Sequence, residues 1–336
     1  MRAWEIVSDG GIDALELNER PVPEPGPGQV LVRVAAFSVN FRDLSTILDP
    51  VARNLPYPTV PNSDCAGEIT ALGAGVTGFK EGDRVAGCFF QAWVAGSITP
   101  TAMASALGGA IDGVLAEYVV LNAHGVVAVP DHLSLEEAAT LPCAALTAWH
   151  ALHAQAPVQA GERVLILGTG GVSVFAQQLC SALGAETIVT SSSDDKLARI
   201  RELGAGATVN YRETPDWDQA VLEMTDGAGV DRVIEVGGPG TLEKSIAAAR
   251  VGGTVALIGI LTGAGGAVVP TDIMRKSLRV QGIYVGSREM FETMNAALAA
   301  HDIRPVIDEV FAFADAPAAY HRMQGAGHFG KLVISF

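Results

Sequence analysis

The 336-residue sequence has little positive charge for its length. Lysine and arginine number 22 against 37 aspartate and glutamate residues, so the formal net charge is −15. Such a chain lacks the basic stripe with which nucleic-acid-binding proteins neutralise phosphates. Its 49% hydrophobic and 18% charged residues also exclude an intrinsically disordered protein, which has few apolar side chains. The composition therefore predicts a globular protein that acts on small molecules.

Cysteine is also scarce, and the sequence contains no Cys-x-x-Cys pair. The four residues are Cys65, Cys88, Cys143 and Cys180. This spacing suits neither a disulfide framework nor a thiolate zinc knuckle. We expect at least three of the four to be small buried apolar side chains.

Uninterrupted apolar runs of membrane-spanning length are missing. Three stretches carry no formal charge, 85–111, 138–161 and 251–271, but proline, glycine or polar residues break each of them. A membrane helix needs roughly 20 predominantly apolar residues. The first residues also lack the apolar core of a secretory signal. We therefore expect no membrane partner and a cytoplasmic location.

The chain length suggests two domains, at about 150 residues each. In the first third, short apolar runs such as 30–35 and 65–73 are separated by glycine and proline, which predicts a small turn-rich β domain. After Pro130 the pattern changes. Ser134 with Glu137 three residues later is a capping box that opens a helix.

From there strands alternate with helices, which predicts a doubly wound parallel α/β sheet. The predicted strands are 163–167, 187–190, 207–210, 232–236 and 254–258, and the predicted helices begin near Val172, Asp195, Trp217 and Leu242. The tail adds a strand at 280–285, a helix at 290–300 and a strand at 332–335, and it returns to the first domain.

A dinucleotide fingerprint follows the first of these strands. The sequence from 168 to 173 is Gly-Thr-Gly-Gly-Val-Ser, with serine at the third glycine position. Gly168 allows a tight turn, Gly170 lets the backbone approach a pyrophosphate, and the amides at the helix N-terminus receive the anion. The preceding strand and the following helix strengthen this otherwise weak motif.

The end of the second strand favours NADP(H) as the cofactor. An NAD site usually has an acidic residue there, about 20 residues after the fingerprint. Here Ser191 and Ser192 occupy the position, and Lys196 and Arg199 follow. Hydroxyls and cations accept a 2′-phosphate. Asp194 and Asp195 argue against this, although acidic side chains in a first helical turn also complement the helix dipole.

Several motifs together resemble the medium-chain dehydrogenase/reductase superfamily over nearly the full chain, and most closely its zinc-independent branch with the NADPH:quinone oxidoreductases. Besides the fingerprint, the matching segments are 38–44, 61–67, 141–152, 209–212 and 328–331. The resemblance implies a Rossmann doubly wound parallel sheet inserted into a GroES-like β domain. The implied boundaries are 127–270 for the Rossmann domain and 1–126 plus 271–336 for the GroES-like domain.

Zinc-binding members of that superfamily hold a catalytic metal with Cys, His and Cys. The matching positions here are Asn40, Ser63 and Cys143, with Asp64 in place of the Glu that follows the His. One thiol does not supply the three protein ligands of a catalytic zinc site. We therefore expect a zinc-free protein.

The resemblance also implies a set of site residues around the cofactor and the substrate. They are Asn40, Arg42 and Asp43 beside the nicotinamide and substrate; Thr147 at the ribose; Gly168, Gly170, Gly171 and Val172 at the pyrophosphate; Ser191, Ser192, Lys196 and Tyr211 around the 2′-phosphate; Gly237, Gly259 and Ile260 facing the cofactor; and Val285, Gly286 and Lys331 from the tail. Asn40, Asp43 and Asp64 are the catalytic candidates. For Asp64, a proton relay and a structural carboxylate remain equally open.

Without a Lewis acid a free alcohol is a difficult substrate, whereas a quinone or an α,β-unsaturated carbonyl needs only hydrogen-bond donors for its developing charge. The prediction is an NADPH-dependent reductase of such compounds. A metal-dependent alcohol dehydrogenase and a non-catalytic NADPH-binding protein are the alternatives. We expect an apolar substrate pocket built from Phe41, Leu44, Phe89, Phe90, Trp93 and Tyr284, and a homodimer formed through 254–260.

Overall fold

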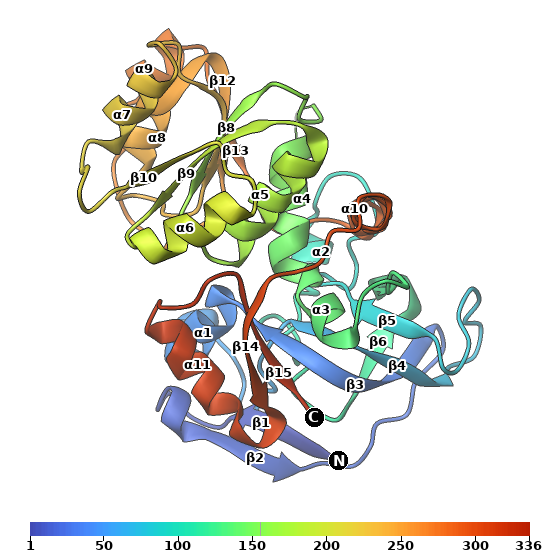
Figure 1. The fold of residues 1–336 in the computed structure, drawn as a ribbon. Helices are drawn as coiled ribbons and strands as arrows, with labels where there is room; N and C mark the ends of the chain where they lie inside the picture. Colours follow the sequence, from blue (N-terminus) through green and yellow to red (C-terminus); the bar gives the residue numbers. More distant parts are fainter. Residues whose placement is uncertain (155) are drawn as a thin grey trace. The chain divides into compact units, whose positions relative to one another are not determined.

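The computed structural model describes residues 1–154 and 156–336. Contacts divide the chain into two compact units (Figure 1). Unit 1 comprises Met1–Leu146 and Val285–Phe336, and unit 2 comprises Thr147–Tyr284. The second unit is thus one continuous segment inserted into the first. The sequence-based domain boundaries at 127 and 270 stay a prediction.

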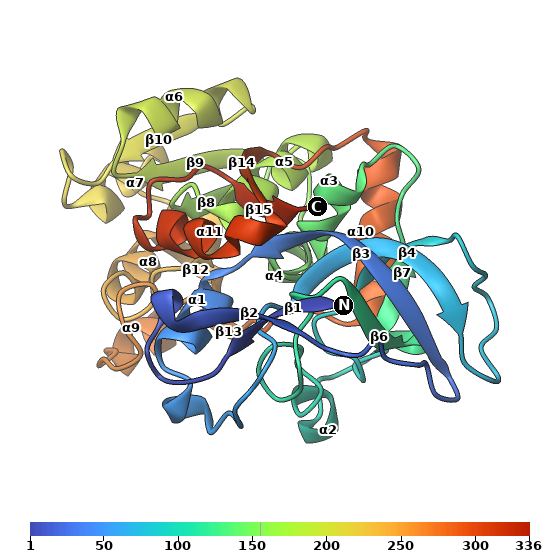
Figure 2. The same ribbon diagram turned by 90° about the horizontal axis from the view of Figure 1, so that it is seen from below.

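Unit 1 is built on a seven-stranded β-sheet with the order β14-β15-β3-β4-β5-β7, and β6 pairs with β3 off this path. Its strands are β3 (Gln29–Val39), β4 (Asp64–Leu72), β5 (Arg84–Gly87), β6 (Tyr118–Asn122), β7 (Val126–Ala128), β14 (Ile307–Ala312) and β15 (Lys331–Ser335). The antiparallel pair β3 and β4 runs through the middle of this unit (Figure 2). The predicted strands at 30–35, 65–73 and 332–335 are confirmed, whereas β14 was not expected.

The remaining elements of unit 1 surround that sheet. They are the hairpin strands β1 (Arg2–Ile6) and β2 (Leu15–Glu19), and the helices α1 (Phe41–Leu48), α2 (Pro100–Met103), α3 (Leu135–Ala139), α10 (Arg288–Ala300) and α11 (Ala316–Gln324). The Ser134 capping box is confirmed, because its hydroxyl accepts from Glu137 N and its own N–H donates to the Glu137 carboxylate. After α3 the backbone forms a π-helical turn over Leu141–Ala145, which leads into α4 (Leu146–His153).

Unit 2 contains a six-stranded parallel sheet with the order β10-β9-β8-β11-β12-β13. Its strands are β8 (Arg163–Leu167), β9 (Glu186–Ser191), β10 (Ala207–Asn210), β11 (Val230–Glu235), β12 (Ala249–Leu257) and β13 (Arg279–Gly282). Numbered by their order in the chain, the strands lie across the sheet as 3-2-1-4-5-6, which is the Rossmann order. The progression across the sheet changes direction between the neighbouring strands β8 and β11. The predicted doubly wound sheet is confirmed. The segment assigned to the returning tail at 280–285 instead contributes β13, a sixth strand at the edge.

Helices lie between successive strands along the chain. They are α5 (Gly171–Leu183), α6 (Asp194–Glu202), α7 (Trp217–Met224), α8 (Leu242–Ala248) and α9 (Pro270–Arg275). The strands are apolar on both faces, as expected for a covered parallel sheet; Val164, Leu165 and Ile166 of β8 are fully buried. Among the described residues, no helix is both long enough and apolar enough to cross a bilayer.

Candidate active site

A chain of hydrogen bonds joins a buried ammonium group to a buried carboxylate in unit 1. Lys331 Nζ donates to Val39 O at 2.7 Å and to Asn40 Oδ1 at 2.6 Å. Asn40 Nδ2 donates to Ser63 Oγ at 3.4 Å, and Ser63 Oγ donates to Asp64 Oδ1 at 2.8 Å. These hydrogen bonds therefore link the first residue of β15 to the N-terminus of α1 and the start of β4.

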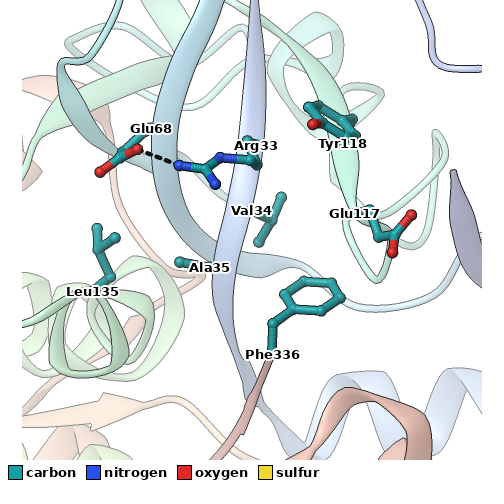
Figure 3. A pocket seen from close by; sticks show the side chains of 8 residues that line it. All are labelled: Arg33, Val34, Ala35, Glu68, Glu117, Tyr118, Leu135 and Phe336. Atoms are coloured by element: carbon teal, nitrogen blue, oxygen red, sulfur yellow. Dashed lines mark hydrogen bonds and ion pairs between the residues drawn. The ribbon is translucent and has the colours of Figure 1, made fainter.

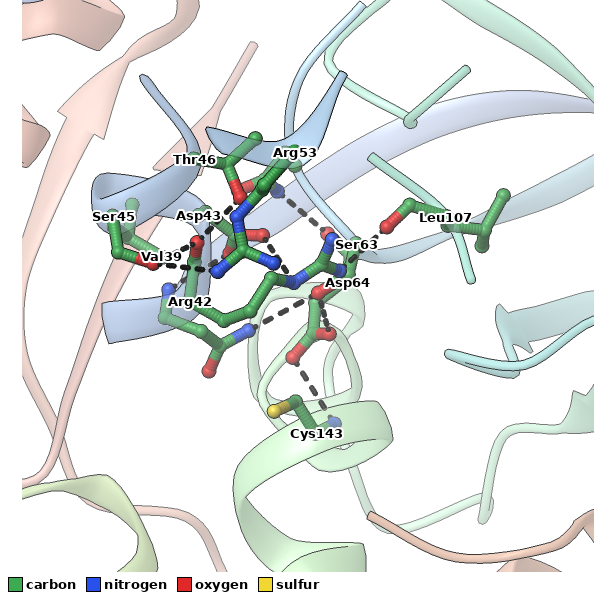
Figure 4. A network of polar contacts seen from close by, with 12 residues as sticks. Val39, Arg42, Asp43, Ser45, Thr46, Arg53, Ser63, Asp64, Leu107 and Cys143 are labelled. Atoms are coloured by element: carbon green, nitrogen blue, oxygen red, sulfur yellow. Dashed lines mark hydrogen bonds and ion pairs between the residues drawn. The ribbon is translucent and has the colours of Figure 1, made fainter. Parts of the chain in front are cut away.

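Asp64 is the last acceptor of these hydrogen bonds, and Figure 4 shows it beside Ser63 and Cys143. Its side chain is fully buried, and Oδ2 accepts from Ser38 Oγ at 3.1 Å and from the Cys143 N–H at 3.2 Å. With Ser63, three donors satisfy the carboxylate, as a buried charged group requires. These bonds give Asp64 a structural function, and its action as a proton relay remains a prediction.

Asp43 is the second buried carboxylate of the site. Its Oδ2 accepts from the Asn40 N–H at 3.0 Å, which fixes the first turn of α1. In the part of the chain that the structure describes, Asp43 Oδ1 has no hydrogen bond, and Arg42 Nε lies 3.5 Å away. Burial raises the pKa of Asp43 to about 6, against the attraction of Arg42. This carboxyl group can therefore exchange a proton near neutral pH.

Two further titratable groups complete the network. Burial lowers the pKa of Lys331, although Asp64, Cys143 and Asp43 act in the opposite direction. Desolvation and the Asp64 carboxylate raise the pKa of the Cys143 thiol. A protonated thiol is a poor metal ligand and a poor nucleophile. The other three cysteines are buried, as expected.

Arg42 is held within unit 1. Its guanidinium carbon lies 4.3 Å from the centroid of the Phe89 ring, and Nη2 donates to Leu107 O at 2.5 Å. The cation–π contact and the carbonyl bond fix this side chain firmly. Its contribution to cofactor binding remains a prediction.

The predicted apolar substrate pocket is largely wrong. Leu44, Phe89, Phe90 and Trp93 are at most 5% exposed and belong to the interior, where Phe89 and Phe90 pack edge to face. Phe41 and Tyr284 are the exposed members, at 44% and 43%. Apolar residue type in a loop-rich segment does not distinguish a pocket wall from a core, because both need the same side chains. The segment 91–109, part of the uncharged stretch 85–111, contains the short helix α2.

The phosphate loop of unit 2 follows β8 at the point where the strand order reverses. Gly168 has φ of +74°, a conformation that glycine adopts without strain. Gly170 precedes the 13-residue helix α5, and Gly171 and Val172 begin it. The first amides of a helix have no intrahelical acceptor and attract anions. The loop therefore has the backbone geometry that a pyrophosphate requires.

The end of β9 carries hydroxyl groups and no carboxylate. Ser191 is the last residue of the strand and Ser192 is partly exposed. Tyr211, whose backbone N–H donates to Ser191 O, is 41% exposed and therefore not a core aromatic. Asp194 lies in the first turn of α6, where its Oδ1 accepts from Asn210 Nδ2 at 2.8 Å. Lys196 lies in the same first turn of α6.

The loops after β11 and β12 lie against one another. A Cβ atom on Gly259 would come within 2.1 Å of Val236 O, and one on Gly238 within 2.9 Å of Gly259 O. Thr262 Oγ1 also donates to Gly237 O at 2.8 Å. The predicted residues Gly237, Gly259 and Ile260 are thereby brought together, and Ile260 is 53% exposed.

Glu235 organises the first of these loops, and the sequence analysis missed it. Its fully buried carboxylate accepts from the N–H groups of Gly237 and Gly238 at 2.7 and 3.0 Å, from Thr241 Oγ1 at 2.7 Å, and from the Ser245 hydroxyl. A carboxylate directly after the buried apolar pair Val233 and Ile234, and shortly before two glycines, was the available signal.

Three predicted residues lie where the chain passes between the units. Thr147 is buried and begins unit 2, while Val285 and Gly286 resume unit 1. Val285 has φ of +54°, which is strained for a β-branched residue. A Cβ on Gly286 would come within 2.8 Å of the Leu146 side chain. The local structure therefore constrains both residues, Val285 through its backbone conformation and Gly286 through the lack of space for a side chain.

Two surface hollows of unit 1 lie apart from the predicted residues. One, of about 440 Å³, is lined by charged and apolar side chains, and Arg33 and Glu68 form an ion pair at 2.6 Å in it (Figure 3). The other, of about 600 Å³, is lined by residues that include Arg20 and Asp112. None of the predicted site residues lines either hollow. Among the described residues, no group of three or more His, Cys, Asp or Glu side chains is arranged as a metal site.

Family models match both parts of the chain. The model described as alcohol dehydrogenase GroES-like domain matches residues 26–131, and the model described as zinc-binding dehydrogenase matches residues 171–300. The fold accordingly combines a GroES-like domain with a Rossmann sheet. The chain belongs to the medium-chain dehydrogenase/reductase superfamily, and it is an oxidoreductase of that superfamily, whose members bind nicotinamide cofactors.

Similar proteins carry different names. A zinc-type alcohol dehydrogenase-like protein of Schizosaccharomyces pombe is 44% identical over 331 residues, which cover 96% of each chain. The 2-methylene-furan-3-one reductase of Solanum lycopersicum is 31% identical, covering 99% of this chain and 79% of the relative. A crystal structure of an NAD-dependent alcohol dehydrogenase superimposes with a TM-score of 0.91 at 33% identity, covering all of both chains.

Proposed function

We propose that this oxidoreductase uses NADPH, without zinc, to reduce an α,β-unsaturated carbonyl compound or a quinone. The observation that carries the proposal is the hydrogen-bonded chain from Lys331 through Asn40 and Ser63 to Asp64. By resemblance, Asn40 and Ser63 stand where zinc-binding members hold metal ligands. Here the same positions carry an amide and a hydroxyl that act as hydrogen-bond donors.

The chemistry of these side chains does not fit a zinc ion. Asn40 Oδ1 already accepts from an ammonium group, and a cation beside it disfavours a second positive charge. Of the three matching positions Cys143 alone carries a thiol, and one thiol does not supply the three protein ligands of a catalytic zinc site.

The residues of unit 2 fit a dinucleotide. Gly168, Gly170 and Gly171 with the first amides of α5 would hold the pyrophosphate. Ser191, Ser192, Lys196 and Tyr211 would surround a 2′-phosphate, and the Asp194 carboxylate in the first turn of α6 accepts from Asn210 Nδ2. When bound, the nicotinamide supplies a hydride to an electron-poor carbon.

The residues of unit 1 act on the oxygen that gains negative charge. Asn40 keeps one amide hydrogen beyond the bond to Ser63, and this hydrogen donates to the carbonyl oxygen as charge develops there. Asp43, with its raised pKa and the unsatisfied Oδ1, is the carboxyl group best able to exchange the proton near neutral pH. A quinone presents the same conjugated carbonyl as an enone, so both classes fit.

A free-alcohol dehydrogenase is the second candidate, favoured by the names of the S. pombe relative and the superimposed crystal structure. One assay separates the two. Chelator-treated protein is mixed with NADPH or NADH and a quinone, an enone or an aldehyde, and cofactor oxidation is followed. Rapid NADPH-linked reduction of the enone or quinone supports the proposal. Turnover of the aldehyde alone, only after zinc is restored, refutes it, and tight NADPH binding without any turnover favours a binding protein.

The proposal also includes a cytoplasmic homodimer. Its support is the exposed edge of the parallel sheet, where β13 has one strand partner and Ile260, Leu261 and Val269 are 53%, 54% and 47% exposed. Apolar surface of this kind marks protein contacts. Sedimentation equilibrium of the wild type and of Leu261→Asp tests it: a dimer that the substitution dissociates supports this interface.

A further inference from the structure

Asn40 has a side chain whose function depends on its orientation. An amide that rotates by 180° exchanges its oxygen, which accepts, with its nitrogen, which donates. The carbonyl oxygen of a substrate needs the nitrogen. Whether Asn40 can stabilise negative charge is therefore decided by whatever holds the amide in one of its two orientations.

The two ends of the hydrogen-bonded chain remove this ambiguity. The Lys331 ammonium can only donate, so the atom 2.6 Å from it must be Asn40 Oδ1. At the other end the Asp64 carboxylate accepts from Ser63 Oγ, so Ser63 has its lone pairs free to accept from Asn40 Nδ2. Every bond in the chain then runs in one direction, from the cation to the carboxylate.

The Lys331 ammonium group is buried among polar groups of unit 1. It is 3% exposed, and the bonds that its Nζ makes go to Val39 O and Asn40 Oδ1, both in unit 1. Burying an ammonium group is costly unless it is paired and hydrogen-bonded. Here burial lowers the pKa of Lys331 while the Asp64 and Asp43 carboxylates act to raise it, and Asn40 is the side chain to which its Nζ donates.

We infer that Lys331 is a positioning residue, which holds the Asn40 amide with its oxygen inward and its nitrogen available to the carbonyl oxygen of the substrate. The inference rests on the proposed function and assigns Lys331 to substrate activation instead of cofactor binding. It also limits the substrate class to acceptors whose oxygen gains charge during reduction.

Two substitutions at Lys331 distinguish its action as a hydrogen-bond donor from its contribution to packing. Lys331→Arg remains a pure donor, whereas Lys331→Gln can bond to Asn40 in either amide orientation. At saturating NADPH we expect Lys331→Arg to keep kcat for cyclohexenone within about threefold of the wild type, and Lys331→Gln to lose at least about tenfold. Lys80→Gln, at an exposed lysine, is the matched control and should change nothing. Equal rates for the Arg and Gln variants, with matching thermal unfolding, would overturn the inference.

A double-mutant cycle tests whether Lys331 acts through Asn40. Asn40→Ala should lower kcat about 10²-fold, the size measured when an oxyanion donor is removed. Adding Lys331→Gln should then have little further effect on kcat, and this substitution should leave the Kd for NADPH within about twofold of its parent, the wild type or Asn40→Ala. Independent, multiplying losses, or a raised NADPH Kd with unchanged saturated kcat, would make Lys331 a cofactor ligand instead.

A spectroscopic readout separates failure of this inference from failure of the proposed function. If the wild type reduces neither an enone nor a quinone, the proposed function fails. Nitrogen NMR of protein labelled at asparagine still reports on the Asn40 amide. A single well-resolved NH₂ pair in the wild type and in Lys331→Arg, with a second or broadened pair in Lys331→Gln, supports the fixed orientation. An identical Asn40 signal in all three proteins contradicts it.

Discussion

Ser173 Oγ donates to Leu167 O at 2.7 Å. The serine at the third position of the fingerprint thus bonds back to the last residue of β8, and its hydroxyl is both buried and satisfied. The third glycine of this motif serves to let the helix pack closely on the strand. A serine whose hydroxyl is bonded to that strand meets the same requirement.

Ser173→Ala should lower the free energy of unfolding by about 1 kcal/mol, because Leu167 O loses a hydrogen bond in a buried environment. The Kd for NADPH should change less than twofold, since the loop glycines are untouched. Urea denaturation and fluorescence titration measure the two quantities. Ser181→Ala, at an exposed serine of the same helix, is the control and should lower the free energy of unfolding by a smaller amount.

Gly259→Ala should disturb the cofactor-facing loops. The added Cβ would lie 2.1 Å from Val236 O, so the loops after β11 and β12 must separate. We expect a lower thermal midpoint and at least about tenfold weaker NADPH binding. Gly265→Ala is a matched control, because its Cβ would meet nothing within 4 Å. Equal behaviour of the two variants would show that the loops do not need this close approach.

The sequence could predict the parallel sheet and the phosphate loop because both depend on local patterns. Continuous apolar runs indicate buried strands, and the turn at Gly168 depends on residues next to one another. It could also nominate Asn40, Asp43, Asp64 and Lys331 individually, through resemblance. The hydrogen bonds between them could not be predicted from local sequence patterns, because Lys331 and Asn40 are 291 positions apart.

Side chains whose role depends on their burial in the fold were harder to interpret from the sequence. Glu235 looked like any strand-ending acid, although four donors converge on it in the fold. Phe89 and Phe90 looked like pocket aromatics, yet they are core residues. The edge strand β13 was assigned to the tail, because a short strand before a loop carries no sign of the sheet that it joins.

Lys276 stabilises the end of α8. Its Nζ donates to Ile246 O, Ala247 O and Ala249 O at 3.1, 2.6 and 2.9 Å, so one ammonium group caps the last carbonyls of the helix. A cation also complements the negative end of the helix dipole. Lys276→Met should lower the free energy of unfolding by about 2 kcal/mol, with Lys80→Met as an exposed control near zero. Chemical denaturation of both variants decides this.

Asp43 should make stability depend on pH. Its pKa rises from 3.8 to about 6 in the folded protein, so the folded state binds this proton more tightly than the unfolded state. The contribution of Asp43 to stability should therefore be lost as pH rises from about 4 to about 6, and at about 1.4 kcal/mol per pH unit this loss approaches about 3 kcal/mol.

Asp43→Asn removes this titration, and the amide oxygen can still accept from the Asn40 N–H. The variant should gain stability relative to the wild type between pH 4 and 6, measured by urea denaturation across that range. Asp83→Asn provides a contrast, because hydrogen bonds from Lys80 lower the pKa of Asp83 and give the opposite dependence on pH. A difference between Asp43→Asn and the wild type that stays constant with pH would contradict the raised pKa.

Ser192→Asp tests the choice between the two cofactors. The new carboxylate would stand just after β9, where NAD-binding proteins keep an acid for the ribose diol, and it would repel a 2′-phosphate. We expect the Kd for NADPH to rise at least about tenfold, while the Kd for NADH stays equal or falls. Fluorescence titration with both cofactors measures this, and Ser192→Asn, of the same size without the charge, should change NADPH binding much less. If the wild type already prefers NADH and Ser192→Asp leaves NADPH binding unchanged, the 2′-phosphate does not lie at Ser192 and the NADPH part of the proposed function fails.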